Sequence, residues 1–195
     1  MSVPVLHDFP LDPRCYSVRL ALALLGVEHR VQPVDVFPGG AHLESPYREL
    51  TPTGELPVFE TGTTALVGSV DVLVHLADGT VWSATSDDWI DFATGPLEQF
   101  YSCREQSLYT TDPVDTTAAR AVVQSLDDLL AARTTDEAWV AADLPTVADI
   151  ALFPAAALSR DIGIDHDRYP ALRSWIRRIK QLPGFVEMPG IPVFP

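Results

Sequence analysis

The stretch Leu6-His-Asp-Phe-Pro-Leu-Asp-Pro-Arg-Cys-Tyr-Ser-Val-Arg19 decides the fold, because it joins a strand pattern to a helix pattern within a few residues. Residues 4–7 are short and apolar, as in a buried strand, and residues 15–25 carry apolar side chains at helical spacing. Residues 30–36 then alternate between apolar and polar side chains. This order predicts a β-α-β unit.

The residues that follow extend this unit. A segment rich in Pro and Gly, residues 37–40, separates the β-α-β pattern from further short elements, and Thr61-Gly62-Thr63 has the composition of a hairpin turn. The predicted elements are a short helix at 43–50, strands at 56–60 and 64–66, and a helix at 69–77.

The second half of the chain is predicted to be entirely helical, because the strand pattern vanishes from Asp87 onward. Thr146 and Asp149 have the spacing of a capping box, so a helix should start there. The predicted helices cover 89–109, 116–132, 147–159 and 171–181. We therefore expect an α/β domain at 1–78, a linker at 79–86 and an α-helical domain at 87–195.

Composition and charge restrict the kinds of molecule that the chain is expected to bind. The chain has 195 residues, 27 of them acidic and 13 basic, for a net charge of −14, and Lys180 is its single lysine. Nucleic acid is not an expected partner, because phosphate binding needs clustered cations. We interpret the basic group Arg173, Arg177, Arg178 and Lys180 as one solvated helix face.

Other sequence patterns argue against a membrane protein and against a disulfide or metal site. No apolar run reaches the ~18 to 20 residues of a membrane span, and Asp8 interrupts the place where a signal peptide would lie, so we expect a cytoplasmic protein that does not insert into membranes. Cys15 and Cys103 have no metal or disulfide spacing, and the five histidines show no zinc pattern. We expect reduced thiols and no metal.

Four passages together resemble the cytosolic glutathione transferase superfamily over essentially the whole chain. The first is the opening stretch with its helix ending at Gly26. The others are Thr51-Pro-Thr-Gly-Glu-Leu-Pro-Val58, Leu66-Val-Gly-Ser-Val-Asp-Val-Leu-Val-His-Leu76 and Leu144-Pro-Thr-Val-Ala-Asp-Ile150. The resemblance implies a thioredoxin-like N-terminal domain, an all-α C-terminal domain and a ligand cleft between them.

The resemblance also implies three residues that bind the thiol cofactor. Pro57 matches a proline that follows a cis peptide bond, and the backbone of Leu56 would pair with the cysteinyl part of glutathione. Ser69 matches a serine at a helix start that binds the γ-glutamyl carboxylate, where the helix N-terminus favours an anion. Ser69 is equally explained as a simple N-cap. The preceding position usually holds Glu or Gln and is Gly68 here, which counts against glutathione.

The catalytic position departs from the family pattern. The Ser or Cys that acts on the thiolate falls on Asp12, and the alternative Tyr position falls near Asp8. A carboxylate repels a thiolate and raises the pKa of the thiol, which opposes thiol activation. The segment Asp12-Pro-Arg-Cys15 resembles a redox motif whose attacking cysteine is missing, so we expect Cys15 to be inert packing.

Further site candidates follow from the same resemblance. Arg14, near the start of the first helix, is a candidate to clamp an anionic substrate, although a surface arginine is the simpler interpretation. Tyr101 is a candidate catalytic partner for Asp12 and Arg14. Residues matching the substrate-lining elements of the family are Phe9, Phe100, Arg104 and Tyr109. Aromatic side chains at helical spacing are otherwise typical of a core.

Three functions remain open. The first is a glutathione-transferase-like enzyme that conjugates, or isomerises with the help of a thiol, a small electrophilic or apolar molecule in the interdomain cleft. The second is an isomerase, lyase or cyclase, with a place in secondary metabolism, that uses Asp12 as acid or base without glutathione. The third is a non-catalytic binding or scaffold protein. The cofactor would be glutathione, another low-molecular-weight thiol, or none, and we expect a homodimer.

Overall fold

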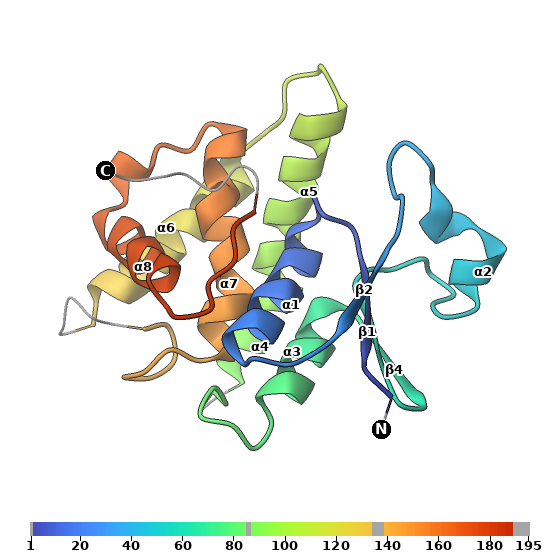
Figure 1. Cartoon of the computed structure of the whole chain (residues 1–195). Coiled ribbons are helices and arrows are strands. Elements are labelled where there is room, and N and C mark those ends of the chain that lie inside the picture. Colours follow the sequence, from blue (N-terminus) through green and yellow to red (C-terminus); the bar gives the residue numbers. More distant parts are fainter. Residues whose placement is uncertain (1, 85–86, 134–138, 189–195) are drawn as a thin grey trace.

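The structure is a computed structural model that describes residues 2–84, 87–133 and 139–188 (Figure 1). The strands are β1 (Val5–Asp8), β2 (Arg30–Pro33), β3 (Val58–Thr61) and β4 (Thr64–Val67). The helices of the N-terminal part are α1 (Pro13–Leu24), η1 (Ala41–Leu43), α2 (Ser45–Arg48) and α3 (Ser69–Ala77). The C-terminal part contains α4 (Asp88–Thr94), α5 (Pro96–Tyr109), α6 (Thr117–Ala131), α7 (Val147–Leu158), η2 (Ser159–Ile162), η3 (His166–Arg168) and α8 (Pro170–Lys180).

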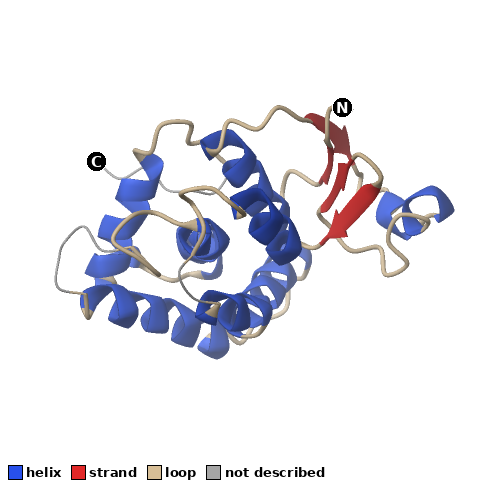
Figure 2. Cartoon of the chain, turned by 90° about the horizontal axis from the view of Figure 1, so that it is seen from below, coloured by secondary structure: helices blue, strands red, loops and turns tan. Residues whose placement is uncertain are grey.

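The four strands form one mixed sheet in the order β2-β1-β3-β4. β1 is parallel to β2 and antiparallel to β3, so that Leu6 lies opposite Val31 on one side and Phe59 on the other. Helices α1 and α3 cover the face of the sheet that points toward the helical half, and α2 lies on the other side (Figures 1 and 2). This is the expected thioredoxin-like arrangement, followed by an all-α domain.

Two apolar clusters lie on opposite sides of α1. Leu6, Phe59 and Val18 belong to the cluster between the sheet and its two covering helices. Tyr16 and Leu20, on the other side of α1, belong to the large cluster built around α7. Because α1 is packed on both sides, its apolar residues do not form a single stripe, and the two halves of the chain share a continuous core.

The predicted helix at 89–109 is two helices, so that prediction was wrong. α4 ends at Thr94, and α5 begins at Pro96, with Gly95 between them. A proline has no backbone N–H and its ring collides with the preceding turn, so it starts a helix more readily than it continues one. The predicted helix at 43–50 is also shorter, with α2 reduced to a single turn after η1.

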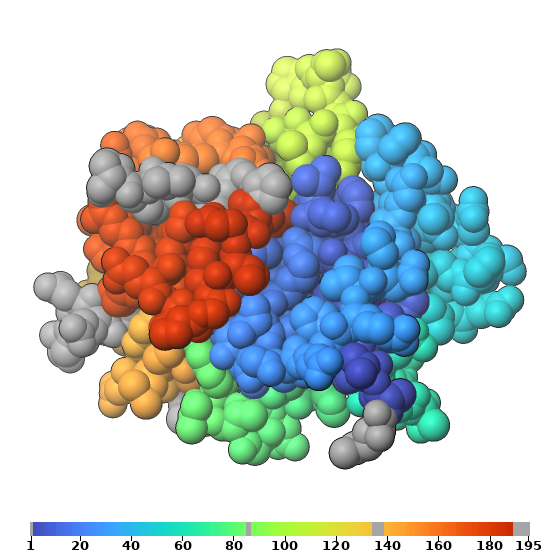
Figure 3. Space-filling model, viewed as in Figure 1, coloured from blue at the N-terminus to red at the C-terminus, as the bar shows by residue number. Residues whose placement is uncertain are grey.

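The C-terminal part is held to α1 and capped as predicted at α7. The Thr146 N–H donates to Asp149 Oδ2 at 2.9 Å, which completes the capping box at the start of α7. The Tyr16 hydroxyl of α1 donates to the carbonyl of Val186 at 2.7 Å, and Figure 3 shows the red C-terminal segment lying against the blue surface of α1. Over the described ranges, the structure has no helix of the length and apolarity that a bilayer crossing requires.

Candidate functional site

Asp12 is the N-cap of α1. Its Oδ1 accepts hydrogen bonds from the backbone N–H of Arg14 at 2.6 Å and of Cys15 at 3.1 Å. These donors belong to the first turn of a helix, where backbone N–H groups have no intrahelical partner, and Pro13 at the first position has no N–H to satisfy. The sequence pattern Asp-Pro therefore fixes where α1 begins, and it leaves Asp12 Oδ2 outside the cap.

The electrostatic environment of Asp12 combines burial with nearby positive charge. Burial raises the pKa of Asp12, and the Arg14 guanidinium and the two backbone N–H groups lower it by less, so that the net shift is upward. Asp12 Oδ2 lies 3.8 Å from the Arg14 guanidinium, and the Asp12 side chain is 22% exposed. Burial thus outweighs the helix terminus, and the Asp12 carboxyl exchanges a proton nearer neutral pH than an ordinary aspartate does.

Arg14 links α1 to α5. Its guanidinium makes a two-pronged ion pair with Glu98, in which Nε donates to Glu98 Oε1 at 3.1 Å and a terminal nitrogen binds Oε2. The same guanidinium lies over the ring of Tyr101, 4.7 Å from its centroid. An anionic substrate at Arg14 would therefore compete with Glu98, which the sequence analysis did not foresee.

Tyr101 lies beneath Arg14 and is almost fully buried. Burial raises the pKa of Tyr101 well above its ordinary range, and the Arg14 guanidinium lowers it by less. The phenol therefore stays protonated near neutral pH and cannot act there as a base. Its chemical role is limited to donating a hydrogen bond or supporting the guanidinium.

The thiol-binding candidates lie at the start of α3. The Leu56–Pro57 peptide bond is cis, as the resemblance implies, and the Pro57 carbonyl accepts the Gly68 N–H at 2.9 Å. Ser69 is the first residue of α3, and the N-cap is Gly68, with φ of +85°, so the interpretation of Ser69 as the cap was wrong. The hydrogen bond between Gly68 and Pro57 therefore places the cis peptide bond close to the residue that precedes Ser69.

A cavity of about 310 Å³ opens beside Ser69 and is unusually acidic. Its charged lining consists of Glu55, Asp71 and Glu98, against the single cation Arg14. A Cβ atom at Gly68 would lie 3.1 Å from Glu55 Oε1, so Glu55 occupies the space into which a side chain at this position would extend. Glu55 therefore places a carboxylate next to the position where the family pattern has Glu or Gln.

A second, smaller cavity of about 50 Å³ lies on the other side of Arg14. It brings together the three predicted catalytic residues, Asp12, Arg14 and Tyr101, with three of the four predicted substrate residues, Phe9, Arg104 and Tyr109. The ring of Phe37, from the loop after β2, contacts the ring of Tyr109 with centroids 4.9 Å apart. Two elements far apart in the sequence therefore meet at the edge of this cavity.

Two of the predicted lining residues have different roles. Phe100 does not line the small cavity, because its side chain is fully buried in the core of the helical domain, where it packs against Tyr101. Arg104 lines the cavity, but its guanidinium is engaged. Its Nε donates to Asp161 Oδ2 at 2.9 Å and a terminal nitrogen donates to the Leu11 carbonyl at 3.3 Å, so Arg104 anchors the loop that carries Asp12.

The cysteines and histidines add no further chemistry to these cavities. Cys15 is fully buried and accepts the Phe9 N–H at 3.4 Å, and burial raises the pKa of its thiol well above the ordinary value, followed by the effect of Asp12. Both cysteines are free thiols. Across the part of the chain that the structure describes, no group of His, Cys, Asp or Glu side chains is arranged to hold a metal ion.

Comparisons with known proteins agree with this architecture. The family model of the glutathione S-transferase N-terminal domain matches residues 13–78, and the family model of the C-terminal domain matches residues 88–178. Glutathione S-transferase D7 of Anopheles gambiae is 26% identical over 192 residues, which cover 91% of this chain and 86% of that protein.

Solved structures of related proteins superimpose along nearly the whole chain. A crystal structure described as a possible glutathione S-transferase from Rhodopseudomonas palustris is 29% identical, covers 98% of this chain and 100% of its own, and has a TM-score of 0.85. A glutathione transferase homologue from Lodderomyces elongisporus with two glutathione molecules per subunit is 19% identical, covers 94% and 96%, and has a TM-score of 0.84. The chain therefore belongs to the glutathione S-transferase superfamily.

Proposed function

We propose that the protein is a glutathione-transferase-like enzyme that joins a thiol to a small electrophilic or apolar molecule, or uses the thiol to isomerise it. The observation that carries this proposal is the pairing of the cis-Pro57 backbone with the start of α3, beside the 310 Å³ cavity. The thiol would pair with the backbone of Leu56 and extend along this cavity toward Ser69. The second molecule would enter the small cavity near Asp12.

Asp12 sets the chemistry that this arrangement favours. A thiolate held next to a carboxylate is disfavoured, so we assign Asp12 the role of a general base and not of a thiolate stabiliser. The thiol proton would pass to Asp12 while sulfur bonds to the electrophilic carbon and the leaving group departs. The raised pKa of Asp12 brings it closer to that of a thiol, which makes this transfer less unfavourable.

The acidic lining of the larger cavity bears on the choice of thiol. Glutathione carries two carboxylates and one ammonium, and three protein carboxylates face one arginine in this cavity. We therefore propose weak binding of glutathione at millimolar concentrations, or binding of another low-molecular-weight thiol with less negative charge. We also propose a homodimer, which sedimentation analysis of the purified protein would test.

The test combines titration of reduced glutathione by calorimetry with a conjugation assay on an aromatic electrophile. Saturable binding with turnover supports the proposal. Ser69→Ala should weaken thiol binding by about 1 kcal/mol, the usual value of one hydrogen bond, or by more if the bond is to a carboxylate. Ser102→Ala, at an exposed position of α5, is the matched control and should change nothing. Absence of thiol binding at millimolar concentration together with absence of turnover would exclude this function.

A second candidate function rests on the same carboxylate. Asp12, with its raised pKa and its position in a small cavity lined by aromatic rings, fits an isomerase, lyase or cyclase that needs no thiol. The two candidates differ in two measurements: the second predicts turnover in the absence of any thiol and an unchanged rate for Ser69→Ala.

A further inference from the structure

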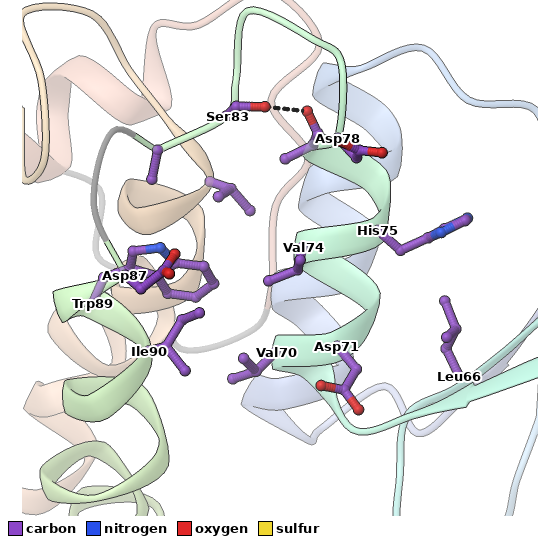
Figure 4. Close-up of a pocket in the computed structure, with 13 residues that line it drawn as sticks. Leu66, Val70, Asp71, Val74, His75, Asp78, Ser83, Asp87, Trp89 and Ile90 are labelled. Atoms are coloured by element: carbon purple, nitrogen blue, oxygen red, sulfur yellow. Dashed lines mark hydrogen bonds between the residues drawn. The ribbon is translucent and has the colours of Figure 1, made fainter.

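A hollow between α3 and α4 has the apolar character of a subunit interface. It has a volume of about 620 Å³, and Val70 and Val74 of α3 point toward Ile90 of α4 (Figure 4). Val74 is 44% exposed although it is a large apolar residue. Because homodimer interfaces are more apolar than the rest of a protein surface, the homodimer proposed above would cover this hollow, and no ligand is assigned to it.

A separate cavity lies on the opposite side of the sheet, next to α2. It has a volume of about 250 Å³, and its walls come from β1, from β2 and from the segment that contains η1 and α2. We call it the α2 cavity. α2 covers the side of the sheet that faces away from the helical half (Figures 1 and 2). The lining of the α2 cavity shares no residue with the cavities at Asp12 and Ser69 or with the hollow between α3 and α4.

Much of the wall of the α2 cavity is apolar. Val34 and Tyr47, both 7% exposed, belong to one apolar cluster, and Ala41 and Leu50 pack against it. The position of Tyr47 is fixed because its hydroxyl donates to the Glu55 carbonyl at 2.9 Å. An engineered apolar cavity of about 150 Å³ is large enough to bind benzene, so the α2 cavity has room for a molecule with a single ring.

A buried histidine of β1, His7, also lines the α2 cavity. Successive side chains of a strand point to opposite faces of a sheet, so His7 lies on the face opposite Leu6, where its ring meets the ring of Tyr47 edge-on with centroids 5.8 Å apart. His7 is 8% exposed, and its Nε2 lies 2.6 Å from Glu60 Oε1. Since a carboxylate accepts hydrogen bonds, Nε2 carries the hydrogen. Within the described part of the chain, His7 Nδ1 has no hydrogen-bond partner.

We propose that the α2 cavity binds a single-ring phenol, with its ring against the apolar wall and its hydroxyl hydrogen-bonded to His7 Nδ1. A polar atom in a largely buried position gains from a ligand that completes its hydrogen bonds. In the neutral imidazole Nδ1 accepts a hydrogen bond, in the imidazolium it donates one, and a phenolic hydroxyl fits both cases. Glu44 in the lining and Glu60 beside His7 disfavour an anionic ring compound. The site goes beyond the proposed catalytic function, because neither Asp12 nor Ser69 belongs to it.

The test compares phenol with toluene, which has a methyl group in place of the hydroxyl. In NMR titrations of the full-length protein without any thiol, both compounds at millimolar concentration should shift the backbone amide resonances of Gln32 and Ala41 in a saturable way. Phenol alone should shift the Nδ1 resonance of His7. Absence of saturable shifts at Gln32 and Ala41, or equal effects of the two compounds on His7 Nδ1, would overturn the proposal.

Variants separate the hydrogen bond from the apolar wall. His7→Gln places an amide nitrogen where Nε2 binds Glu60 and leaves no acceptor at the position of Nδ1. It should weaken phenol binding about fivefold, the usual value of one net hydrogen bond, and leave toluene binding unchanged, which also shows that the variant is folded. Ala41→Leu fills part of the cavity and should weaken the binding of both compounds, whereas Ala131→Leu, at an exposed position of α6, is the matched control. An unchanged phenol affinity in His7→Gln, or equal losses in the two Leu variants, would contradict the proposal.

Discussion

Asp12 and Asp149 both accept backbone N–H groups at the start of a helix, and they differ in what their second oxygen does. Asp149 caps α7 with both oxygens engaged, because Oδ1 accepts Val140 N–H at 2.9 Å and Trp175 Nε1–H at 2.8 Å while Oδ2 accepts Thr146 N–H. Asp12 caps α1 with Oδ1 alone, and its Oδ2 faces Arg14 at the wall of the small cavity. An aspartate at a helix start is therefore structural in one domain and available for chemistry in the other.

The largest effect is expected where the cap is fully enclosed. Asp149→Ala leaves the buried donors of Val140 and Trp175 without their acceptor, and each such donor costs about 1–3 kcal/mol. We expect a loss of about 4 kcal/mol in the free energy of unfolding, measured by urea denaturation. Ala151→Gly, in the same buried helix, is a control for helix propensity and the loss of one buried methyl group, with a cost of about 2 kcal/mol. A loss below 1 kcal/mol for Asp149→Ala would contradict the role given to Asp149.

The second effect concerns a buried pair in the helical domain. His166 Nε2 lies 2.7 Å from the Ser159 hydroxyl, both side chains are fully buried, and burial lowers the pKa of His166 to about 4, followed by the effect of Arg160. The unfolded chain takes up this proton near pH 6.5 and the folded protein does not, so stability is complete above pH 6.5 and falls as the pH drops toward 4.

The measurement is urea unfolding at pH 7.5 and 4.5. Since one pKa unit corresponds to about 1.4 kcal/mol, the histidine accounts for a loss of about 3 kcal/mol between these values. His166→Gln removes the titrating group, so the variant should lose about 3 kcal/mol less than the wild type over the same interval. Carboxylates contribute equally to both proteins and cancel in the difference. Identical losses in the two proteins would rule out the assigned state of His166.

The smallest effect is expected at the half-open cap. Asp12→Ala removes the acceptor for two backbone N–H groups at the start of α1 and should lower the free energy of unfolding by about 1 kcal/mol. Asp12→Asn keeps a capping oxygen and should stay within about 0.5 kcal/mol of the wild type. If Asn were as destabilising as Ala, the charge of Asp12 and not its capping oxygen would hold the helix start.

Part of the fold and of the candidate site can be predicted from the sequence. The spacing of Thr146 and Asp149 predicted the start of α7 correctly. The Gly95-Pro96 pair marks the boundary between α4 and α5, but the apolar periodicity runs through it and predicted a single helix. The family pattern predicted the cis peptide bond before Pro57 correctly, and its assignment of Asp12 to the catalytic position stays a prediction.

The contacts that decide the chemistry of the site could not be predicted from the sequence, because they join residues that are far apart in it. Glu98 meets Arg14 across 84 positions of sequence, and only the tertiary fold brings the two side chains together. Phe100 was predicted to line the cleft and Tyr101 to act in it. Adjacent residues of a helix point in different directions, and the side chain of Phe100 is buried in the core. Helical spacing identifies a face but not the neighbour that the face contacts.

The most direct test of the account is the dependence of kcat/KM on pH for the wild type and Asp12→Asn, measured with a saturating thiol and an aromatic electrophile. If Asp12 is the general base, the wild-type rate falls with decreasing pH through an apparent pKa above the ordinary aspartate value of about 3.9. The Asn variant should lose this dependence and about 100-fold or more in rate, with thiol affinity within about twofold of the wild type. A variant with the wild-type rate and pH profile would show that Asp12 caps the helix and takes no part in the reaction.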